Sequence, residues 1–257
     1  MFVEVFVDPF VIFCASCVAL PLVLERAYLT QADVVAYLTE PAMLFAAAVL
    51  VATVAEAKLA RRRQRRPVPL SLRERVRARW YLLNGVVIHV LLDGLVGVFK
   101  ASTLLARNYA KLDARYAAAL GSFTGSAVHI VSLMELCVKG PLCLLLYRAY
   151  QTNSPHRDAL ELFSCVTQAY GTVVYLGQEA ISGMPHFDVD RQLEFTPHYL
   201  VYFWFAIVLG CVLYLIVPCW LGWQAYKRLV AASASSLPHA AAAAAAAVAS
   251  GRTVKAR

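Results

Sequence analysis

The stretch WYLLNGVVIHVLLDGLVGVF, residues 80–99, decides the fold of this 257-residue chain. About 20 apolar residues are enough to cross a hydrocarbon core roughly 30 Å thick. His89 and Asp93 nevertheless lie in the middle of the stretch. An ionisable group at that depth costs roughly 3 kcal/mol even on mild scales, so it faces the interior of a helix bundle and carries a function by default. The stretch therefore predicts a membrane-spanning helix that contributes to a site.

The rest of the chain has the same character, with 60% hydrophobic and only 16% charged residues. Further apolar segments long enough to span occupy residues 41–58, 122–147, 159–178 and 198–223. We therefore predict an all-α, polytopic transmembrane bundle of five helices, which occupies residues 41–228. Residues 6–24 form another apolar segment within an N-terminal region, residues 1–40, of open role. Glu4 and Asp8 at its start do not fit a signal peptide, so an uncleaved anchor or an interfacial helix remains open.

The net charge of +8 is concentrated in one loop, because ten of the 24 Lys and Arg residues lie between Lys58 and Arg79. Short basic loops mark the cytosolic side of a membrane protein. The distribution therefore predicts a cytosolic C-terminus and no nucleic-acid partner. A phosphoinositide site in the basic loop is a weaker alternative.

Residues 229–257 are of low complexity, with eight consecutive alanines from Ala240. We expect them to form a cytosolic tail without packed structure of its own. The seven cysteines lie within apolar segments and are poor disulfide candidates. Cys14 and Cys17 have CxxC spacing, but no second pair or histidine cluster accompanies them.

His89 and Asp93 are four positions apart, which places them on one face of a helix. The carboxylate can hold the tautomer of the imidazole or stabilise its protonated form. The alternative is an internal hydrogen bond that only neutralises the pair. Glu135 and Lys139 have the same spacing on a later segment, so Glu135 is either a functional carboxylate or the partner of Lys139.

Tyr214 lies deep within the last apolar segment and is a candidate for a cavity wall. A dry cavity with an acid, a base and aromatic faces suits the protonation of an apolar molecule, because a carbocation survives only where water is excluded. A proton transporter would also use buried carboxylates, but the chain has no inverted repeat. Six scattered histidines do not form the clusters of a metal hydroxylase, so no metal is expected.

Five motifs in order carry a resemblance to a known family: IHVLLDG, NYAKLDARY, CVKGPLCLL, TQAYGTVVY and YFWFAIVLGCVLYLIVP. They resemble the emopamil-binding protein family, the sterol Δ8-Δ7 isomerases with an EXPERA domain, over about residues 41–228. The resemblance implies a multi-pass protein of the endoplasmic reticulum membrane that binds a sterol within the bundle. It also implies that an acid protonates the ring double bond, that a cation forms at C8 and that a base removes a proton from C7. No cofactor is needed, the partners are the sterol and the lipid bilayer, and a homodimer is left open.

The resemblance carries over position by position. His89 matches the histidine of the family, Asp93 stands in place of a glutamate, and Ser132 and Glu135 stand where the family has Glu and Thr. Cys211 and Tyr214 replace Asn and Trp. The implied catalytic residues are His89, Asp93 and Glu135, and the implied substrate-binding residues are Ser132, Cys211 and Tyr214.

Two functions follow from this comparison. The first is a sterol isomerase of the cholestenol Δ-isomerase type. The alternative is a non-catalytic membrane protein that binds sterols or amphipathic amines, because only His89 is unchanged among these positions. The position of Glu135, beside His89 or paired with Lys139, distinguishes them.

Overall fold

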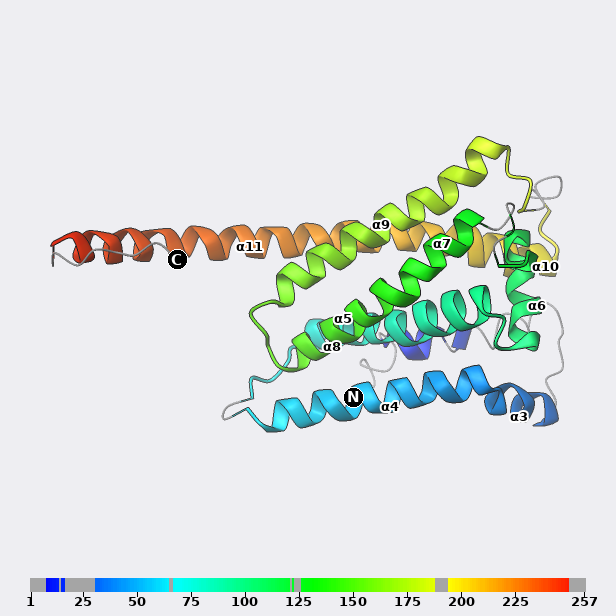
Figure 1. Cartoon of the computed structure of the whole chain (residues 1–257), viewed down its shortest axis with the longest axis horizontal. Helices are drawn as coiled ribbons and strands as arrows, with labels where there is room; N and C mark the ends of the chain where they lie inside the picture. Colours follow the sequence, from blue (N-terminus) through cyan, green and yellow to red (C-terminus); the bar gives the residue numbers. More distant parts are fainter. Residues whose placement is uncertain are drawn as a thin grey trace.

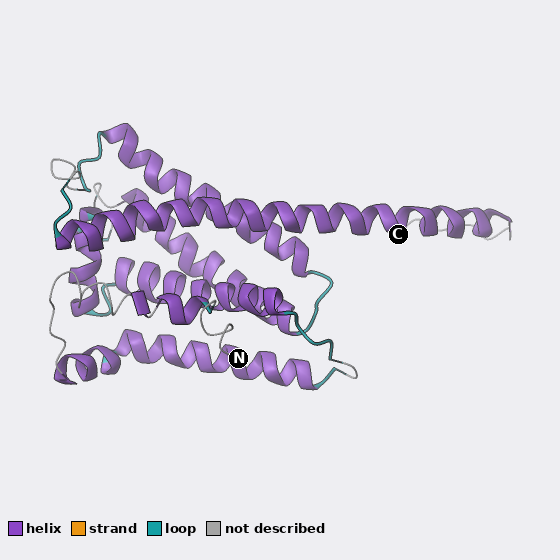
Figure 2. Ribbon diagram, turned by 180° about the vertical axis from the view of Figure 1, so that it is seen from behind, coloured by secondary structure: helices purple, strands orange, loops and turns teal. Residues whose placement is uncertain are grey.

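The computed structural model describes residues 8–13, 15–16, 31–64, 67–120, 122, 126–187 and 194–249. Across these ranges every regular element is a helix and none is a strand, which confirms the all-α prediction. The helices form one bundle, with α3 (Gln31–Thr39) and α4 (Pro41–Arg62) along one side. The helices α9 (Arg157–Ser182) and α11 (Gly210–Ala249) lie along the opposite side (Figures 1 and 2).

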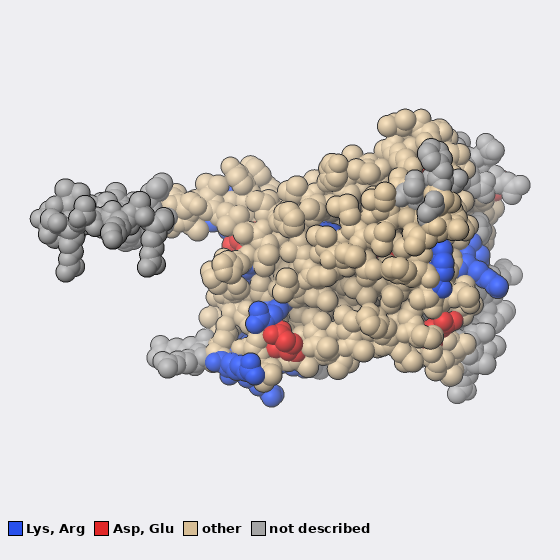
Figure 3. All heavy atoms as spheres, in the orientation of Figure 1, with Lys and Arg blue, Asp and Glu red and all other residues tan. Residues whose placement is uncertain are grey.

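Four helices are long and apolar enough to cross a membrane: Pro41–Arg62, Leu72–Val98, Ala127–Gln151 and Leu200–Ser235. They coincide with four of the five predicted spans, so the chain is a multi-pass membrane protein. The surface agrees with this arrangement, because Lys and Arg gather near the two ends of the bundle and few lie between them (Figure 3).

The fifth predicted span, residues 159–178, is also helical and lies within the 26-residue α9. At 1.5 Å per residue this helix is roughly 39 Å long, which is sufficient to cross a bilayer. Polar residues interrupt its apolar surface, since Asp158, Glu161 and Glu179 lie near its ends and Gln168 in its middle. It is not among the four candidate spans, and its membrane crossing stays a prediction.

Three of the spanning helices contain π-helical segments. The π-helical segments are η1 (Asn84–Val98), η3 (Glu135–Lys139) and η5 (Leu200–Leu209). The first continues α5 (Leu72–Leu83), and the second joins α7 (Ser126–Met134) to α8 (Gly140–Gln151). The third joins the short α10 (Pro197–Tyr199) to α11. Because π-helical turns are rare and occur frequently at functional sites, these segments are the first places to look for one.

The helix Leu72–Val98 is the centre of the bundle, with 78% of its apolar window buried against 11–39% in the other three. Two glycines in this helix allow side chains of the neighbouring helix to approach its backbone closely. A Cβ atom at Gly85 would lie 2.6 Å from Leu144 Cδ2, and one at Gly94 would lie 2.7 Å from Leu136 Cδ1. The η1 backbone therefore packs directly against η3 and α8, which brings their polar side chains together.

Side-chain caps fix where the helices begin. Ser71 and Glu74 form a capping box that starts α5 directly after the basic loop. On the other side of the bundle, Ser102 caps α6 (Thr103–Leu112) and Asp113 caps the short 3₁₀ turn η2 (Ala114–Ala117). The caps thus hold the connection between η1 and α7 in a defined conformation.

The last helix continues well beyond the bundle (Figure 1). Its backbone is helical through the alanine-rich segment to Ala249, and residues 250–257 lie outside the described part. Most of the predicted N-terminal segment, residues 6–24, also lies outside it, together with Cys14 and Cys17.

Candidate functional site

Three ionisable groups predicted from the sequence meet inside the bundle. One ligand-type atom each from His89, Asp93 and Glu135 lie within 4.8 Å of one another. The first two come from η1 and the third from η3, so two separate π-helical segments supply the cluster. His89 is fully buried and Asp93 is nearly so. We call these three residues the acid–imidazole cluster.

Asp93 holds the cluster together. One carboxylate oxygen lies 3.2 Å from Nδ1 of His89, and the other accepts a hydrogen bond of 2.6 Å from the Tyr109 hydroxyl. The predicted contact between positions four apart is therefore present. With both of its oxygens engaged, Asp93 fixes the orientation of the imidazole.

The other nitrogen of His89, Nε2, is buried and has no hydrogen-bond partner. A buried polar atom without a partner costs about 1–3 kcal/mol. In native proteins such an atom is rare and points to a catalytic or ligand-binding role. His89 thus offers one nitrogen to Asp93, while the other makes no hydrogen bond, although the Cys143 thiol lies close enough to interact with the ring.

Glu135 belongs to the cluster and is not paired with Lys139. The Lys139 ammonium instead donates to the backbone oxygen and the side-chain oxygen of Ser164, the latter at 3.0 Å. Glu135 also faces Gly171 of α9, since a Cβ atom there would lie 3.9 Å from Glu135 Oε1. Among the described residues Glu135 and Lys139 thus form no direct salt bridge, although their charges still interact, and Glu135 is partly buried beside His89.

The three predicted substrate-binding residues lie in different surroundings. Tyr214 donates a 2.7 Å hydrogen bond to Asn84 Oδ1, and its ring centroid is 5.8 Å from that of Trp80. Ser132 is buried and its Oγ lies 3.1 Å from the Tyr116 hydroxyl. Cys211 instead interacts electrostatically with Asp113 and Arg115, so it lies toward a second polar network away from the acid–imidazole cluster.

Two tyrosines outside the membrane spans complete the cluster, and the sequence reasoning assigned neither a role. The rings of Tyr109 and Tyr116 have centroids 4.5 Å apart. Burial and the nearby charge of Asp93 raise the pKa of Tyr109 well above its usual value. Tyr109 is therefore a neutral donor to Asp93. The available signal was the NYAKLDARY motif, which contains both tyrosines.

Arg115, in the same motif, anchors this loop. Its fully buried guanidinium makes a bidentate pair with Asp113 and an ion pair of 3.2 Å with Glu179. It also donates to Gln178 at 2.8 Å and stacks over the ring of Tyr175 at 4.6 Å. Because Asp113 and Arg115 precede Tyr116 directly, this network positions the tyrosines against the cluster.

The acid–imidazole cluster could perform proton transfer. It contains a buried imidazole nitrogen without a hydrogen-bond partner, a carboxylate that orients the imidazole and a second carboxyl group beside them. One imidazole and two carboxylates are also ligand types that divalent metals accept. Proton transfer, however, needs no further group at this site.

Comparisons with known proteins find similar sequences. The family model described as EXPERA (EXPanded EBP superfamily) matches residues 105–225. The 3-beta-hydroxysteroid-Delta(8),Delta(7)-isomerase of Mus musculus is 27% identical over 175 residues, which cover 65% of this chain and 70% of the mouse protein. The protein of the same name from Rattus norvegicus has the same identity and coverage. That from Cavia porcellus is 24% identical over 173 residues.

Sequence motifs, a helical membrane bundle and these relatives point in the same direction. Residues 105–225 match the EXPERA, or EXPanded EBP, superfamily model, and the chain is similar to sterol Δ8-Δ7 isomerases.

Proposed function

We propose that this protein is a sterol isomerase that moves a ring double bond from the Δ8 to the Δ7 position. The observation that carries the proposal is the contact between two separate helices at this cluster. Glu135 of η3 meets His89 and Asp93 of η1 there. The relatives are named for the same reaction. These matches support a role in the sterol isomerase family, and the activity of this chain is the proposal.

The reaction needs one proton delivered and one removed. An acid of the cluster adds a proton to C9, the double-bond electrons form the new C–H bond, and the positive charge is left on C8. A base then removes a proton from C7, and the electrons of that C–H bond form the new double bond. We assign these steps to Nε2 of His89, which is unpartnered, and to Glu135, which contacts Asp93 within the cluster. Asp93 orients the imidazole throughout.

The surroundings of the cluster favour a cationic intermediate. Tyr214 presents an aromatic ring that can stabilise positive charge. Its hydroxyl is held by Asn84 and its ring packs against Trp80. Helices around the cluster exclude bulk water, which would otherwise capture the cation.

The proposed function also implies a location and partners for the protein. We propose that the protein lies in the endoplasmic reticulum membrane with its C-terminus in the cytosol, where its sterol substrate and the bilayer are its partners. Ten basic residues between Lys58 and Arg79 support this orientation. A homodimer and the absence of a cofactor remain predictions.

Complementation tests the proposal. The chain is expressed in cells that lack their own Δ8-Δ7 isomerase, and Δ8- and Δ7-sterols are followed by mass spectrometry. Wild type is expected to form Δ7-sterol, while His89→Ala and Glu135→Gln do not. A well-expressed wild type that leaves Δ8-sterol unchanged overturns the isomerase and favours the non-catalytic sterol-binding alternative.

A further inference from the structure

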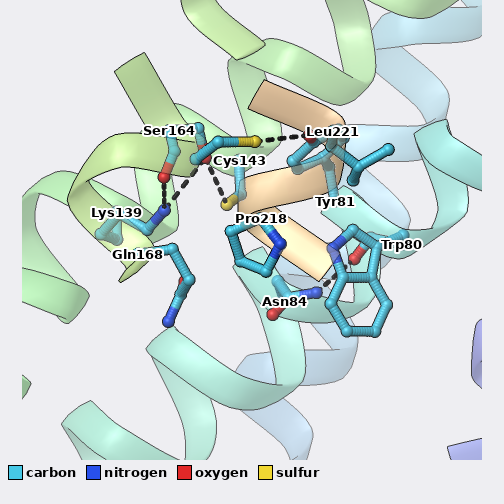
Figure 4. A pocket seen from close by; sticks show the side chains of 10 residues that line it. Trp80, Tyr81, Asn84, Lys139, Cys143, Ser164, Gln168, Pro218 and Leu221 are labelled. Carbon is cyan, nitrogen blue, oxygen red and sulfur yellow. Dashed lines mark hydrogen bonds between the residues drawn. The ribbon is translucent and has the colours of Figure 1, made fainter. Parts of the chain in front are cut away.

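A small cavity lies next to the acid–imidazole cluster, and its lysine and glutamine have no part in the reaction described above. It is bounded by α5, η1, η3, α8, α9 and α11, and its volume is about 10 Å³. Such a cavity accommodates about one water molecule or one oxygen-sized group. Polar side chains project into it, among them Asn84, Lys139 and Gln168 (Figure 4).

Lys139 is the first unusual group in this cavity. It is only 5% exposed and lies within a membrane-spanning helix. Its ammonium group has three hydrogens to donate. The backbone and side-chain oxygens of Ser164 accept two of them. One N–H remains for a further acceptor in the cavity.

Gln168 is the second. Its side chain is 8% exposed and lines the same cavity from α9. Among the described residues its amide group makes no side-chain hydrogen bond, whereas its backbone oxygen accepts one from Thr172. Buried amides are normally hydrogen-bonded. Gln168 therefore presents an unused acceptor and unused donors to the cavity.

The cavity and the acid–imidazole cluster are built on the same two π-helical segments. Lys139 follows Glu135 by four positions on η3, and Asn84 precedes His89 by five positions on η1. A rigid fused-ring lipid carries a hydroxyl on one ring and a double bond on the next, so it presents two functional groups to neighbouring places of this kind.

We propose that Lys139 and Gln168 form an oxygen-binding subsite that receives the ring hydroxyl of the sterol while its double bond lies at the acid–imidazole cluster. This inference rests on the proposed function for the identity of the ligand. Lys139 donates to the hydroxyl oxygen, and the hydroxyl hydrogen is donated to the Gln168 amide oxygen. A ketone can use only the donors of the subsite, and a sterol without an oxygen leaves the third N–H of Lys139 and the Gln168 amide without a partner.

Ligand binding to the full-length chain in lipid nanodiscs tests the subsite. Three Δ8-sterols are compared that differ at a single ring carbon. This carbon carries a hydroxyl in the first compound, a ketone oxygen in the second and only hydrogens in the third, the deoxy compound. Wild type is expected to bind the hydroxysterol roughly 10- to 100-fold more tightly than the deoxy compound, with the ketone between them. Lys139→Met and Gln168→Leu are expected to remove most of this difference and to leave binding of the deoxy compound unchanged.

Thr167→Val is the matched control. Thr167 precedes Gln168 on α9, but its hydroxyl donates to backbone oxygens of the same helix and does not line the cavity. This variant is expected to discriminate among the sterols as wild type does. The three-ligand comparison on wild type alone remains decisive if a variant fails to fold.

Equal affinity of wild type for the three sterols, or discrimination that persists in both cavity variants, overturns the subsite. Product formation is measured separately and tests the isomerase. A protein that discriminates but forms no Δ7-sterol retains the subsite and loses the isomerase. One that forms Δ7-sterol without discriminating retains the isomerase and loses the subsite.

Discussion

Tyr109 donates a hydrogen bond of 2.6 Å to Asp93, and this bond connects α6, which lies outside the membrane spans, to the centre of the bundle. Asp93 in turn contacts Nδ1 of His89 at 3.2 Å. The orientation of the imidazole thus depends on a tyrosine of α6, in the connection between η1 and α7. The NYAKLDARY motif acquires a physical role through this contact.

Removing the Tyr109 hydroxyl tests this connection. Tyr109→Phe keeps the ring but frees one oxygen of Asp93. We expect sterol turnover to fall roughly tenfold, because a hydrogen bond to a charged group contributes about 1.5–3 kcal/mol. Turnover of purified protein and its melting temperature are measured together. Unchanged turnover would show that Asp93 needs no support from α6.

The charge of Asp93 is tested by Asp93→Asn, which preserves the shape of the side chain. An amide can favour the wrong tautomer of His89, so we expect turnover to fall on the order of 100-fold or more. Asp158→Asn is the control, since Asp158 pairs with Arg228 and Arg157 near the start of α9. A variant at Asp93 that retains the turnover of the control would remove Asp93 from the account.

Gly171 tests the surroundings of Glu135. A side chain at this position projects toward Glu135 Oε1, whereas a Cβ atom at Gly177 on the same helix meets nothing within 4 Å. We expect Gly171→Leu to lower turnover at least tenfold and Gly177→Leu to leave it unchanged. Parallel kinetic measurements on the two variants check this. An equal loss of turnover in both variants would mean that α9 tolerates a leucine at neither position. Unchanged turnover in both variants would mean that the ligand binds away from Gly171.

Arg115 is expected to determine stability more than chemistry. Arg115→Met leaves Asp113 and Glu179 buried without their cation, which costs about 3–5 kcal/mol. Arg148→Met breaks an exposed pair with Glu56 and is expected to cost less than about 1 kcal/mol. Thermal unfolding in detergent compares the two variants. Similar melting temperatures would contradict an anchoring role for the Arg115 network.

Most of the fold prediction came from the length of the apolar segments, because a membrane-spanning helix requires a long run of apolar residues. Four of the spans coincide with the structure. The helix α9 was harder to assign, since polar residues that face other helices lower its hydropathy. The π-helical segments gave no recognisable pattern, although the contact between His89 and Asp93 is retained within one of them.

The site was predictable only where the contacts are local. Spacing alone left Glu135 two possible roles, and it could not show that Lys139 donates to Ser164, which lies 25 positions later. Long-range contacts of this kind leave no trace in the spacing of residues. Tyr109 and Tyr116 were missed for the same reason. The proposed roles of Ser132, Cys211 and Tyr214 stay predictions.

The central claim is that the buried cluster delivers a proton to the sterol. Purified protein is incubated with a Δ8-sterol in D₂O, and the product is examined by mass spectrometry and NMR. The account predicts Δ7-sterol with one deuterium at C9, and no product from His89→Ala or Glu135→Gln. A Δ7-sterol that contains no deuterium at C9, or undiminished product from both variants, would contradict it.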